Sequence, residues 1–203
     1  LPLDEVVLDW SIINVSANAG VPQGAVGQQS AAPHPPTVDV FLVAVPKEET
    51  ERYKSIMKSA GLNLRALELE NSALVRALIG NDLNPVVIVN IGGRSTSILI
   101  VDGGFERVSH NYEIGGFEIT KSIARSLNVN LKRAEELKRS FGIREEENNV
   151  IQQAMSSLID MMAFETKRTI HGYEELKKTK ISQIILVGGL ANMPNFANYF
   201  KER

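Results

Sequence analysis

Adjacent glycine pairs are the residues of this sequence whose type and spacing point to chemistry. Three of them, Gly92-Gly93, Gly115-Gly116 and Gly188-Gly189, stand where a predicted strand ends. Because glycine has no Cβ, backbone amides beside it can approach an anion closely, and a following helix N-terminus favours phosphate through its dipole. Turn geometry explains any one pair, as it does Gly103-Gly104. Three pairs in succession predict loops that converge at one edge of a sheet and bind phosphate.

Other common chemistries find little support in the 203 residues. The absence of cysteine excludes a disulfide framework, an iron–sulfur cluster and a thiolate zinc site. His34, His110 and His171 lack ligand spacing, so we expect neither a histidine metal site nor a Ser–His–Asp triad. With 22 basic and 24 acidic residues the net charge is -2, which does not favour nucleic acid as a partner.

The sequence also carries no signal for a membrane. No apolar run approaches the roughly 18 residues of a spanning helix, and the first residues lack the basic and apolar regions of a signal peptide. We therefore expect a cytoplasmic chain. Because it begins at Leu1 rather than methionine, and close to a predicted strand, we expect a fragment of a longer protein.

Apolar periodicity, broken by glycine and proline, predicts alternating strands and helices. In the first part we expect strands at residues 6–13, 38–45 and 62–67, and helices at 47–60 and 70–79. Residues 14–37 are rich in Gly, Ala, Gln, Ser and Pro and are expected to form a mobile loop. After the break at 80–85 we expect a meander of strands 86–91, 95–101 and 105–109, then helices 117–127, 131–141 and 146–173, strand 181–187 and helix 195–201.

Four segments, in this order, resemble motifs of the actin-like ATPases. Residues 89–96 (VNIGGRST) resemble the second phosphate motif, and 114–120 (IGGFEIT) the glycine pair that follows it. Residues 134–138 (AEELK) resemble the helix whose glutamate and lysine flank ribose and base, and 184–194 (IILVGGLANMP) the adenosine motif. Within this superfamily, the N-terminal LPLDEV with Asp9-Trp10 and the later AVPKE are similar to the PilM family of type IV pilus assembly proteins, which is related to FtsA. The resemblance covers essentially the whole chain.

The resemblance implies an α/β fold: an actin-like (ribonuclease H-like) lobe plus a small α+β inserted subdomain, as a fragment of a two-lobed fold. Residues 1–68 would be the inserted PilM/FtsA-type subdomain with the mobile loop 14–37. Residues 69–84 would form a connecting helix and linker, and 85–203 the second actin-like lobe. The glycine-rich hairpin that holds the β- and γ-phosphates in the family has no counterpart in this sequence.

The resemblance also implies a function. It indicates a cytoplasmic ATP-binding scaffold of the type IV pilus inner-membrane platform that docks the N-terminal peptide of PilN. Such a scaffold lies peripheral to the membrane through PilN and other platform proteins, and a homo-oligomer is compatible with it. The implied cofactor is ATP with Mg in the intact protein, held weakly or not at all by this fragment. The implied nucleotide-binding residues are Gly92, Gly93, Ser95, Thr96, Gly115, Gly116, Glu135, Lys138, Gly188 and Gly189.

One departure from the superfamily keeps other functions open. Asn90 stands where the second phosphate motif has an aspartate, and an amide lacks the charge that attracts Mg²⁺. We expect weak hydrolysis or none, and we name no catalytic residue and no metal ligand. A structural adaptor of a pilus or type II secretion platform, without nucleotide, is the alternative that Asn90 favours. A sugar or acetate kinase is a third hypothesis, although no acidic residue is recognisable as a catalytic base beside a substrate pocket.

Individual residues also have simpler explanations. Thr96 is equally well explained as an ordinary strand residue. Glu135 and Lys138, three residues apart on a helix, could be a solvated surface pair. For Trp10 and Tyr53 we expect core packing ahead of a peptide-binding role.

Overall fold

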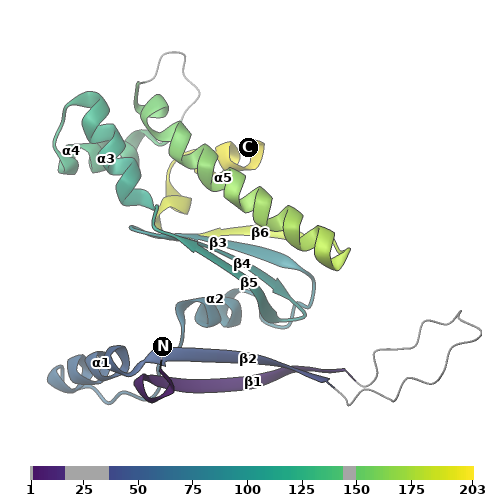
Figure 1. Ribbon diagram of the computed structural model, residues 1–203. Coiled ribbons are helices and arrows are strands. Elements are labelled where there is room, and N and C mark those ends of the chain that lie inside the picture. Colours follow the sequence, from purple (N-terminus) through teal and green to yellow (C-terminus); the bar gives the residue numbers. More distant parts are fainter. Residues whose placement is uncertain (1, 17–36, 144–149) are drawn as a thin grey trace, which may run out of the picture. The chain divides into compact units, whose positions relative to one another are not determined.

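The computed structural model describes residues 2–16, 37–143 and 150–203, and the chain divides into two compact units, Leu1–Leu69 and Glu70–Arg203 (Figure 1). Most of the loop expected over residues 14–37, and the expected start of the long helix at 146–149, lie outside the described residues. At the ends of that loop, residues 14–16 and 37 belong to strands, so the flanking strands are longer than the sequence predicted.

The first unit is a β-ribbon followed by a helix. A short 3-10 turn, η1 (Leu3–Glu5), leads into β1 (Val6–Ser16), which pairs antiparallel with β2 (Thr37–Pro46). The helix α1 (Lys47–Ser59) starts directly after Pro46, a residue that cannot continue a strand ladder, and acidic residues occupy its first turn. Among the described residues of this unit, Val6 is the only buried hydrophobic side chain.

The strand expected at residues 62–67 is wrong, because this segment has no regular structure. The backbone turns at Gly61, where φ is +70°, and Leu62 N–H bonds back to the Met57 carbonyl at 2.9 Å, which closes α1. Beyond that point the apolar residues are exposed, Leu62 at 60% and Leu67 at 45%. The described sheet of this unit consists of β1 and β2, and the segment does not pair with the free edge of either strand.

The second unit is built on a four-stranded sheet in the order β5-β4-β3-β6. The strands β3, β4 and β5 form the antiparallel meander that the sequence predicted, and β6 returns parallel to β3 after three helices. Figure 1 shows α3, α4 and α5 on one side of this sheet and α2 on the other. The bounds are α2 (Glu70–Leu78), β3 (Val86–Ile91), β4 (Thr96–Asp102), β5 (Phe105–Tyr112), α3 (Gly116–Leu127), α4 (Leu131–Phe141), α5 (Val150–Lys177), β6 (Gln183–Val187), the 3-10 turn η2 (Gly189–Asn192) and α6 (Phe196–Glu202).

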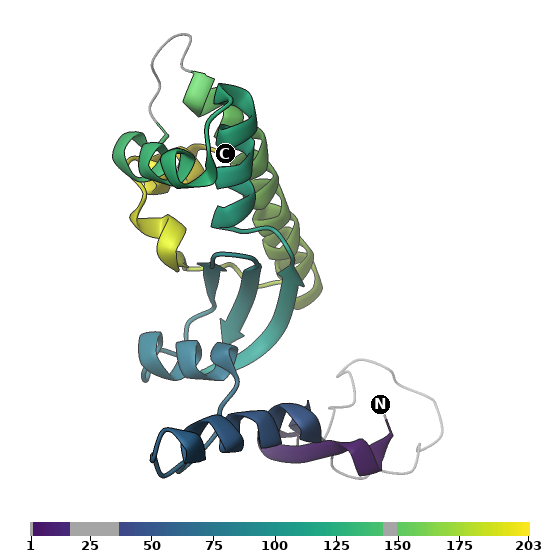
Figure 2. The same ribbon diagram turned by 90° about the vertical axis from the view of Figure 1, so that its left-hand side faces the viewer.

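Successive side chains of the central strands point to opposite faces of the sheet, and this divides the core into two clusters. The face of β3 that carries Val87, Val89 and Ile91 packs in a large cluster with side chains of α3, α5 and α6. The opposite face, with Val86 and Ile88, packs with Ile79 and residues of α2. Figure 2 shows from another side that helices lie on both sides of this sheet. Because both faces of β3 and β4 are covered, these strands read as continuous apolar runs in the sequence.

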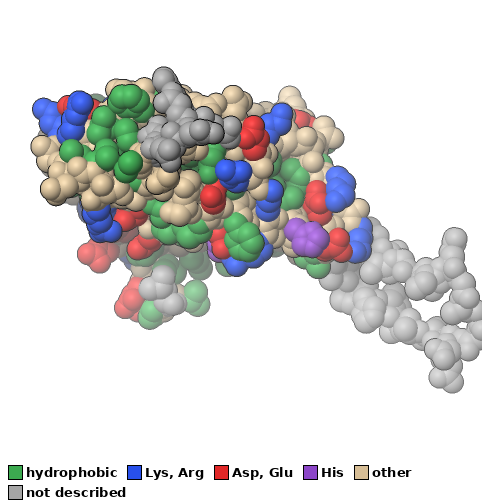
Figure 3. Space-filling view, turned by 90° about the horizontal axis from the view of Figure 1, so that it is seen from above, with side chains coloured by type: hydrophobic (Ala, Val, Ile, Leu, Met, Phe, Trp, Pro, Cys, Tyr) green, Lys and Arg blue, Asp and Glu red, His purple; other side chains and the backbone are tan. Residues whose placement is uncertain are grey.

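The surface of the second unit carries both signs of charge. Seen from above in Figure 3, Lys and Arg side chains are scattered among Asp and Glu side chains, with hydrophobic side chains between them. Many are helical pairs three residues apart, such as Arg133–Glu136 at 3.1 Å and Arg168–Glu165 at 2.7 Å. No helix among the described residues is both long and apolar enough to cross a membrane.

The topology places the glycine pairs at one edge of the sheet. The strands β3 and β6 are parallel, so the loops after them leave from the same edge. The antiparallel β5 runs in the direction of β3, and its end therefore reaches that edge as well. The pairs at 92–93, 115–116 and 188–189 follow these three strands directly or within three residues. The fold thus supplies the convergence that a phosphate site needs.

Candidate functional site

The loops that carry the three glycine pairs are in direct contact. Gly116 N–H donates to the Gly92 carbonyl at 2.9 Å, and Phe117 N–H donates to the Gly93 carbonyl at 2.8 Å. A Cβ on Gly115 would lie 2.6 Å from the Gly92 carbonyl oxygen. The loop before α3 can therefore approach the loop after β3 this closely only with glycine at position 115. The β6 loop is equally close, since a Cβ on Gly188 would lie 2.3 Å from the carbonyl oxygen of Ile91.

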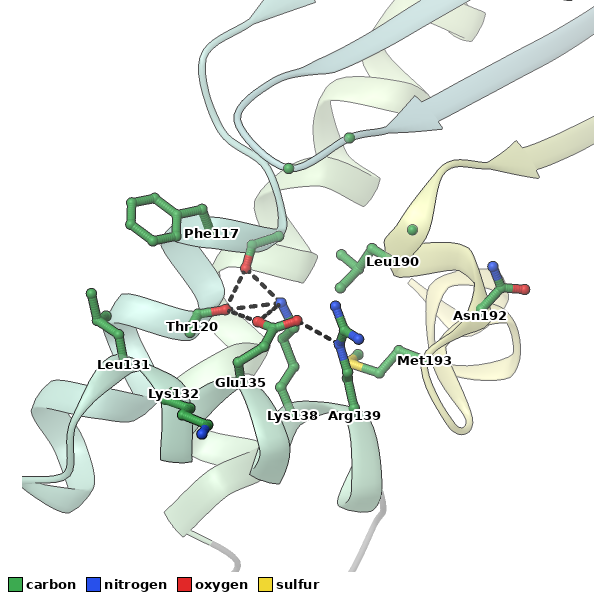
Figure 4. Close-up of a pocket in the computed structure, with 14 residues that line it drawn as sticks. Phe117, Thr120, Leu131, Lys132, Glu135, Lys138, Arg139, Leu190, Asn192 and Met193 are labelled. Carbon is green, nitrogen blue, oxygen red and sulfur yellow. Dashed lines mark hydrogen bonds and ion pairs between the residues drawn. The ribbon is translucent and has the colours of Figure 1, made fainter.

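These loops form one wall of a pocket of about 840 Å³ (Figure 4). The opposite wall is formed by the first turn of α3 and by α4, and η2 closes a third side. Apolar side chains and a group of charged or polar ones share the lining. The lining residues are Gly92, Gly93, Gly116, Phe117, Thr120, Leu131, Lys132, Glu135, Lys138, Arg139, Gly189, Leu190, Asn192 and Met193.

Lys138 lies buried at the bottom of this pocket, with 7% of its surface exposed. Its ammonium donates to the Gly116 carbonyl at 2.9 Å and to the Thr120 hydroxyl at 2.8 Å, and it pairs with Glu135 Oε2 at 2.7 Å (Figure 4). A lysine has three N–H donors, and here each has an acceptor. The alternative of a solvated surface pair therefore does not describe Lys138.

Glu135 is held in its ionised form by the same network. Burial raises the pKa of this carboxyl, but hydrogen bonds from Lys138, Thr120 and Arg139 outweigh that effect and lower the pKa to about 2. Thr120 Oγ1 lies 2.6 Å from Oε2, and Arg139 Nε lies 2.8 Å from Oε1. At neutral pH the pocket therefore presents a fixed carboxylate that can accept hydrogen bonds from hydroxyl groups of a ligand.

Not all the amides at the glycine loops are open to an anion. Those of Gly116 and Phe117, in the first turn of α3, are occupied by the carbonyls of the β3 loop. Gly92 N–H donates to the Ser95 carbonyl at 2.9 Å. Within the described ranges, the amides of Gly93 and Gly189 have no protein acceptor, and both residues line the pocket. These two are the amide donors best placed for a phosphate.

The structure does not bring every residue implied by the resemblance to the pocket surface. Gly92, Gly93, Gly116, Glu135, Lys138 and Gly189 line it, whereas Gly115 and Gly188 stand behind its wall in contact with the β3 loop. Ser95 is exposed beside the β3 loop and does not line the pocket. Thr96 is fully buried, and its hydroxyl donates to the Ile114 carbonyl at 2.6 Å, as a structural strand residue would.

Asn90 faces away from the pocket. Its side-chain N–H donates to Glu70 Oε1 at 2.7 Å, on the side of the sheet covered by α2. Within the part of the chain that the structure describes, no group of three or more His, Asp or Glu side chains could hold a metal ion.

Several lining residues were missed by reasoning from the sequence. Arg139 adjoins Lys138, and Thr120 stands one helical turn after Gly116, so spacing could have found both. The apolar Phe117, Leu131 and Met193 carry no such signal, because their pattern is that of ordinary helix and loop residues.

Comparison with known proteins places this geometry in a family. The profile of one family, described as type IV pilus assembly protein PilM, matches residues 1–203. The chain belongs to the PilM family. The α/β actin-like fold implied by the resemblance is confirmed by similarity to solved structures of PilM, EutJ and MreB proteins.

Three relatives show the extent of the similarity. The ethanolamine utilization protein EutJ of Escherichia coli (strain K12) is 30% identical over 149 residues, 73% of this chain and 48% of EutJ. A chain of the PilM-PilN type IV pilus biogenesis complex matches with a TM-score of 0.73 and 22% identity, over 98% of this chain and 54% of that one. MreB5 of Spiroplasma citri bound to AMPPNP matches with a TM-score of 0.61 and 18% identity, over 78% of this chain and 58% of MreB5. The chain thus spans about half the length of these relatives.

Proposed function

We propose that the pocket binds ATP and that the protein is a cytoplasmic scaffold of the pilus inner-membrane platform, which docks the N-terminal peptide of PilN. The observation that carries the nucleotide assignment is the meeting of three glycine loops with the Glu135 carboxylate around one cavity. A volume of about 840 Å³ lies in the range of small-molecule sites. MreB5 of Spiroplasma citri has been solved with AMPPNP and with ADP, which supports a nucleotide in this fold.

Within the pocket the residues divide by chemistry. The free amides of Gly93 and Gly189 would hold phosphate oxygens, and Glu135 would accept hydrogen bonds from ribose hydroxyls. Phe117 and Leu131 offer apolar surface for the base. Described residues supply no cluster of carboxylates for Mg²⁺, so any bound metal would be held chiefly by the nucleotide, and we derive no step through it.

The first test fills the phosphate cradle without straining the protein. A Cβ on Gly93 or Gly189 would meet no atom within 4 Å, so Gly93→Ala and Gly189→Ala keep the fold and place a methyl group beside the free amides. We expect each to weaken ATP binding about tenfold or more in calorimetry on the natural full-length protein. Gly172→Ala in α5, also with nothing within 4 Å, is the matched control and should bind ATP as the wild type does.

The second test concerns the PilN peptide. In the two-lobed fold that the resemblance implies, a nucleotide can change peptide binding only if it has different affinities for the open and closed forms of the cleft between the lobes. We expect the affinity of the PilN N-terminal peptide, measured by fluorescence anisotropy, to change when ATP saturates the protein. An unchanged affinity would remove this coupling and leave the scaffold role in place.

A structural adaptor that no longer binds nucleotide is the second candidate. The neutral amide of Asn90, bound to Glu70, favours it because the superfamily's carboxylate is missing from this position. Wild-type full-length protein that gives no heat with Mg-ATP would select this function over the first.

A further inference from the structure

Two buried threonines in helices of the second unit share one local geometry. Thr120 in α3 is 2% exposed and Thr166 in α5 is 1% exposed. Each hydroxyl lies 2.9 Å from the carbonyl four residues earlier, Gly116 or Met162. This contact is common for threonine inside a helix and needs no functional explanation. Thr166 therefore shows what a structural threonine does in this fold.

Thr120 makes two contacts that Thr166 lacks. Its oxygen lies 2.8 Å from Lys138 Nζ and 2.6 Å from Glu135 Oε2 (Figure 4). The hydroxyl has one proton, for which the Gly116 carbonyl and the Glu135 carboxylate compete. The carboxylate is charged and closer, so it is the stronger acceptor. Thr120 therefore accepts from Lys138 and donates to Glu135.

The two carboxylate oxygens of Glu135 have different hydrogen-bond partners. Oε2 is held from the buried side by Thr120 and Lys138. Among the described residues, Oε1 accepts a hydrogen bond from Arg139 alone, whose side chain is 78% exposed. A bond from an exposed arginine is screened by water and easily replaced. Oε1 is thus the atom that a ligand hydroxyl can reach, and the bonds on Oε2 set its direction.

We propose that Thr120 is a positioning residue for ribose: through its bond to Glu135 it orients the carboxylate toward the vicinal hydroxyls of the nucleotide, without touching the nucleotide itself. This inference rests on the proposed nucleotide site. A carboxylate held in one orientation accepts from a diol without first losing rotational freedom, which strengthens binding. Thr120 would therefore determine how strongly the pocket distinguishes a ribonucleotide from an analogue without these hydroxyls.

The test compares ATP with 2′,3′-dideoxy-ATP by calorimetry on the natural full-length protein. Thr120→Val removes the hydroxyl at nearly constant volume, Thr120→Ser restores it, and Thr166→Val is the matched control. We expect the wild type, Thr120→Ser and Thr166→Val to prefer ATP over the dideoxy analogue. Thr120→Val should bind ATP about tenfold more weakly and the analogue about equally, so that the preference is lost.

A second readout needs no nucleotide. Loss of a hydrogen bond to the charged form raises the pKa of a carboxyl, so Thr120→Val should raise the pKa of Glu135 in an NMR titration, whereas Thr166→Val should not. An unchanged Glu135 pKa, or an unchanged ATP preference in Thr120→Val, would overturn this inference and leave the proposed function standing. Wild-type protein that binds neither nucleotide would instead remove the proposed function and the ribose role together.

Discussion

Lys138 is the side chain on which the arrangement of the pocket depends. It joins the first turn of α3 to α4, because its ammonium bonds the Gly116 carbonyl and the Thr120 hydroxyl as well as Glu135 on its own helix. A buried charge is tolerated only when it is paired, and removing one partner leaves the other uncompensated. The stability of the second unit is therefore linked to the ionisation of Glu135.

This link predicts a pH dependence. Glu135→Gln keeps the shape but leaves Lys138 without its counter-charge, so the free energy of unfolding at pH 7 should fall by about 1 to 2 kcal/mol. This is less than the full pKa shift would give, because 34% of the Glu135 side chain is in water. The folded-state pKa of Glu135, about 2, lies below its ordinary value of 4.5. Its contribution is thus complete above pH 4.5 and is lost as the pH falls toward 2.

Urea unfolding of the wild type and Glu135→Gln between pH 7 and 2.5 measures this effect. The difference in the free energy of unfolding should be constant above pH 5 and shrink below pH 4.5. Glu136→Gln is the control, since Glu136 pairs with Arg133 on an exposed helix face, 50% and 59% exposed, and should change stability by less than about 0.5 kcal/mol. A difference that stays constant down to pH 2.5 would contradict the prediction.

Residue spacing predicted only part of this network. Glu135 and Lys138 stand three residues apart, which places them on one helix face but does not say whether that face meets water. Burial comes from α3, whose Thr120 and Gly116 lie 18 and 22 residues before Lys138. Such long-range contacts leave no periodic signal in the sequence. The sequence therefore identified Glu135 and Lys138 as a pair on one helix face, but it did not show that this face is buried.

The elements of the second unit, by contrast, were largely predictable. The helix at 131–141 has the predicted bounds, because Asn130 and Gly142 cap its two ends, and the strand at 86–91 agrees as well, because it is a buried apolar run that ends at a glycine pair. The failure at residues 62–67 shows the limit of this reasoning. A strand forms only where a segment pairs with a neighbouring edge, and whether it does so depends on the tertiary arrangement, not on local composition.

The close contact between Gly188, after β6, and Ile91, at the end of β3, gives a prediction for these elements. Gly188 has φ +91°, and a Cβ there would lie 2.3 Å from the Ile91 carbonyl oxygen. Gly80 also has positive φ, +57°, but a Cβ there meets nothing within 4 Å. Gly80→Ala should therefore cost only backbone strain, about 1 kcal/mol, whereas Gly188→Ala should cost about 2 to 4 kcal/mol because backbone must move.

Thermal or urea unfolding of the two variants measures the difference in their free energies of unfolding. Both variants carry the same added methyl group at a positive φ, but Gly188 has ψ 173°, a conformation essentially confined to glycine, so the difference between them reports this backbone strain together with the contact with Ile91. Equal destabilisation would show that the β6 loop can withdraw from β3 at no cost, and that the two loops are not held together as tightly as the geometry indicates.

On the scale of the whole chain, the two units differ in how they are stabilised. The second unit has two apolar clusters on either side of β3 and β4, whose apolar side chains are fully buried. In the described part of the first unit, only Val6 is a buried hydrophobic residue, and Trp10 and Leu42, opposite each other on the ribbon, are 63% and 61% exposed. A two-stranded ribbon with so little cover is marginal in water.

Hydrogen exchange should therefore show two levels of protection. Amides of β3 and β4 should exchange only when the second unit unfolds, whereas those of β1 and β2 should exchange through opening of the ribbon at much lower free energy. Gly188→Ala extends the test, because it destabilises the second unit alone. If the units open independently, this variant should speed exchange in β3 and β4 by about thirtyfold or more, the factor that corresponds to about 2 kcal/mol, and leave β1 and β2 unchanged. Faster exchange in the ribbon by the same factor would mean that the two units unfold as one cooperative body, and that nucleotide bound in the second could stabilise the first.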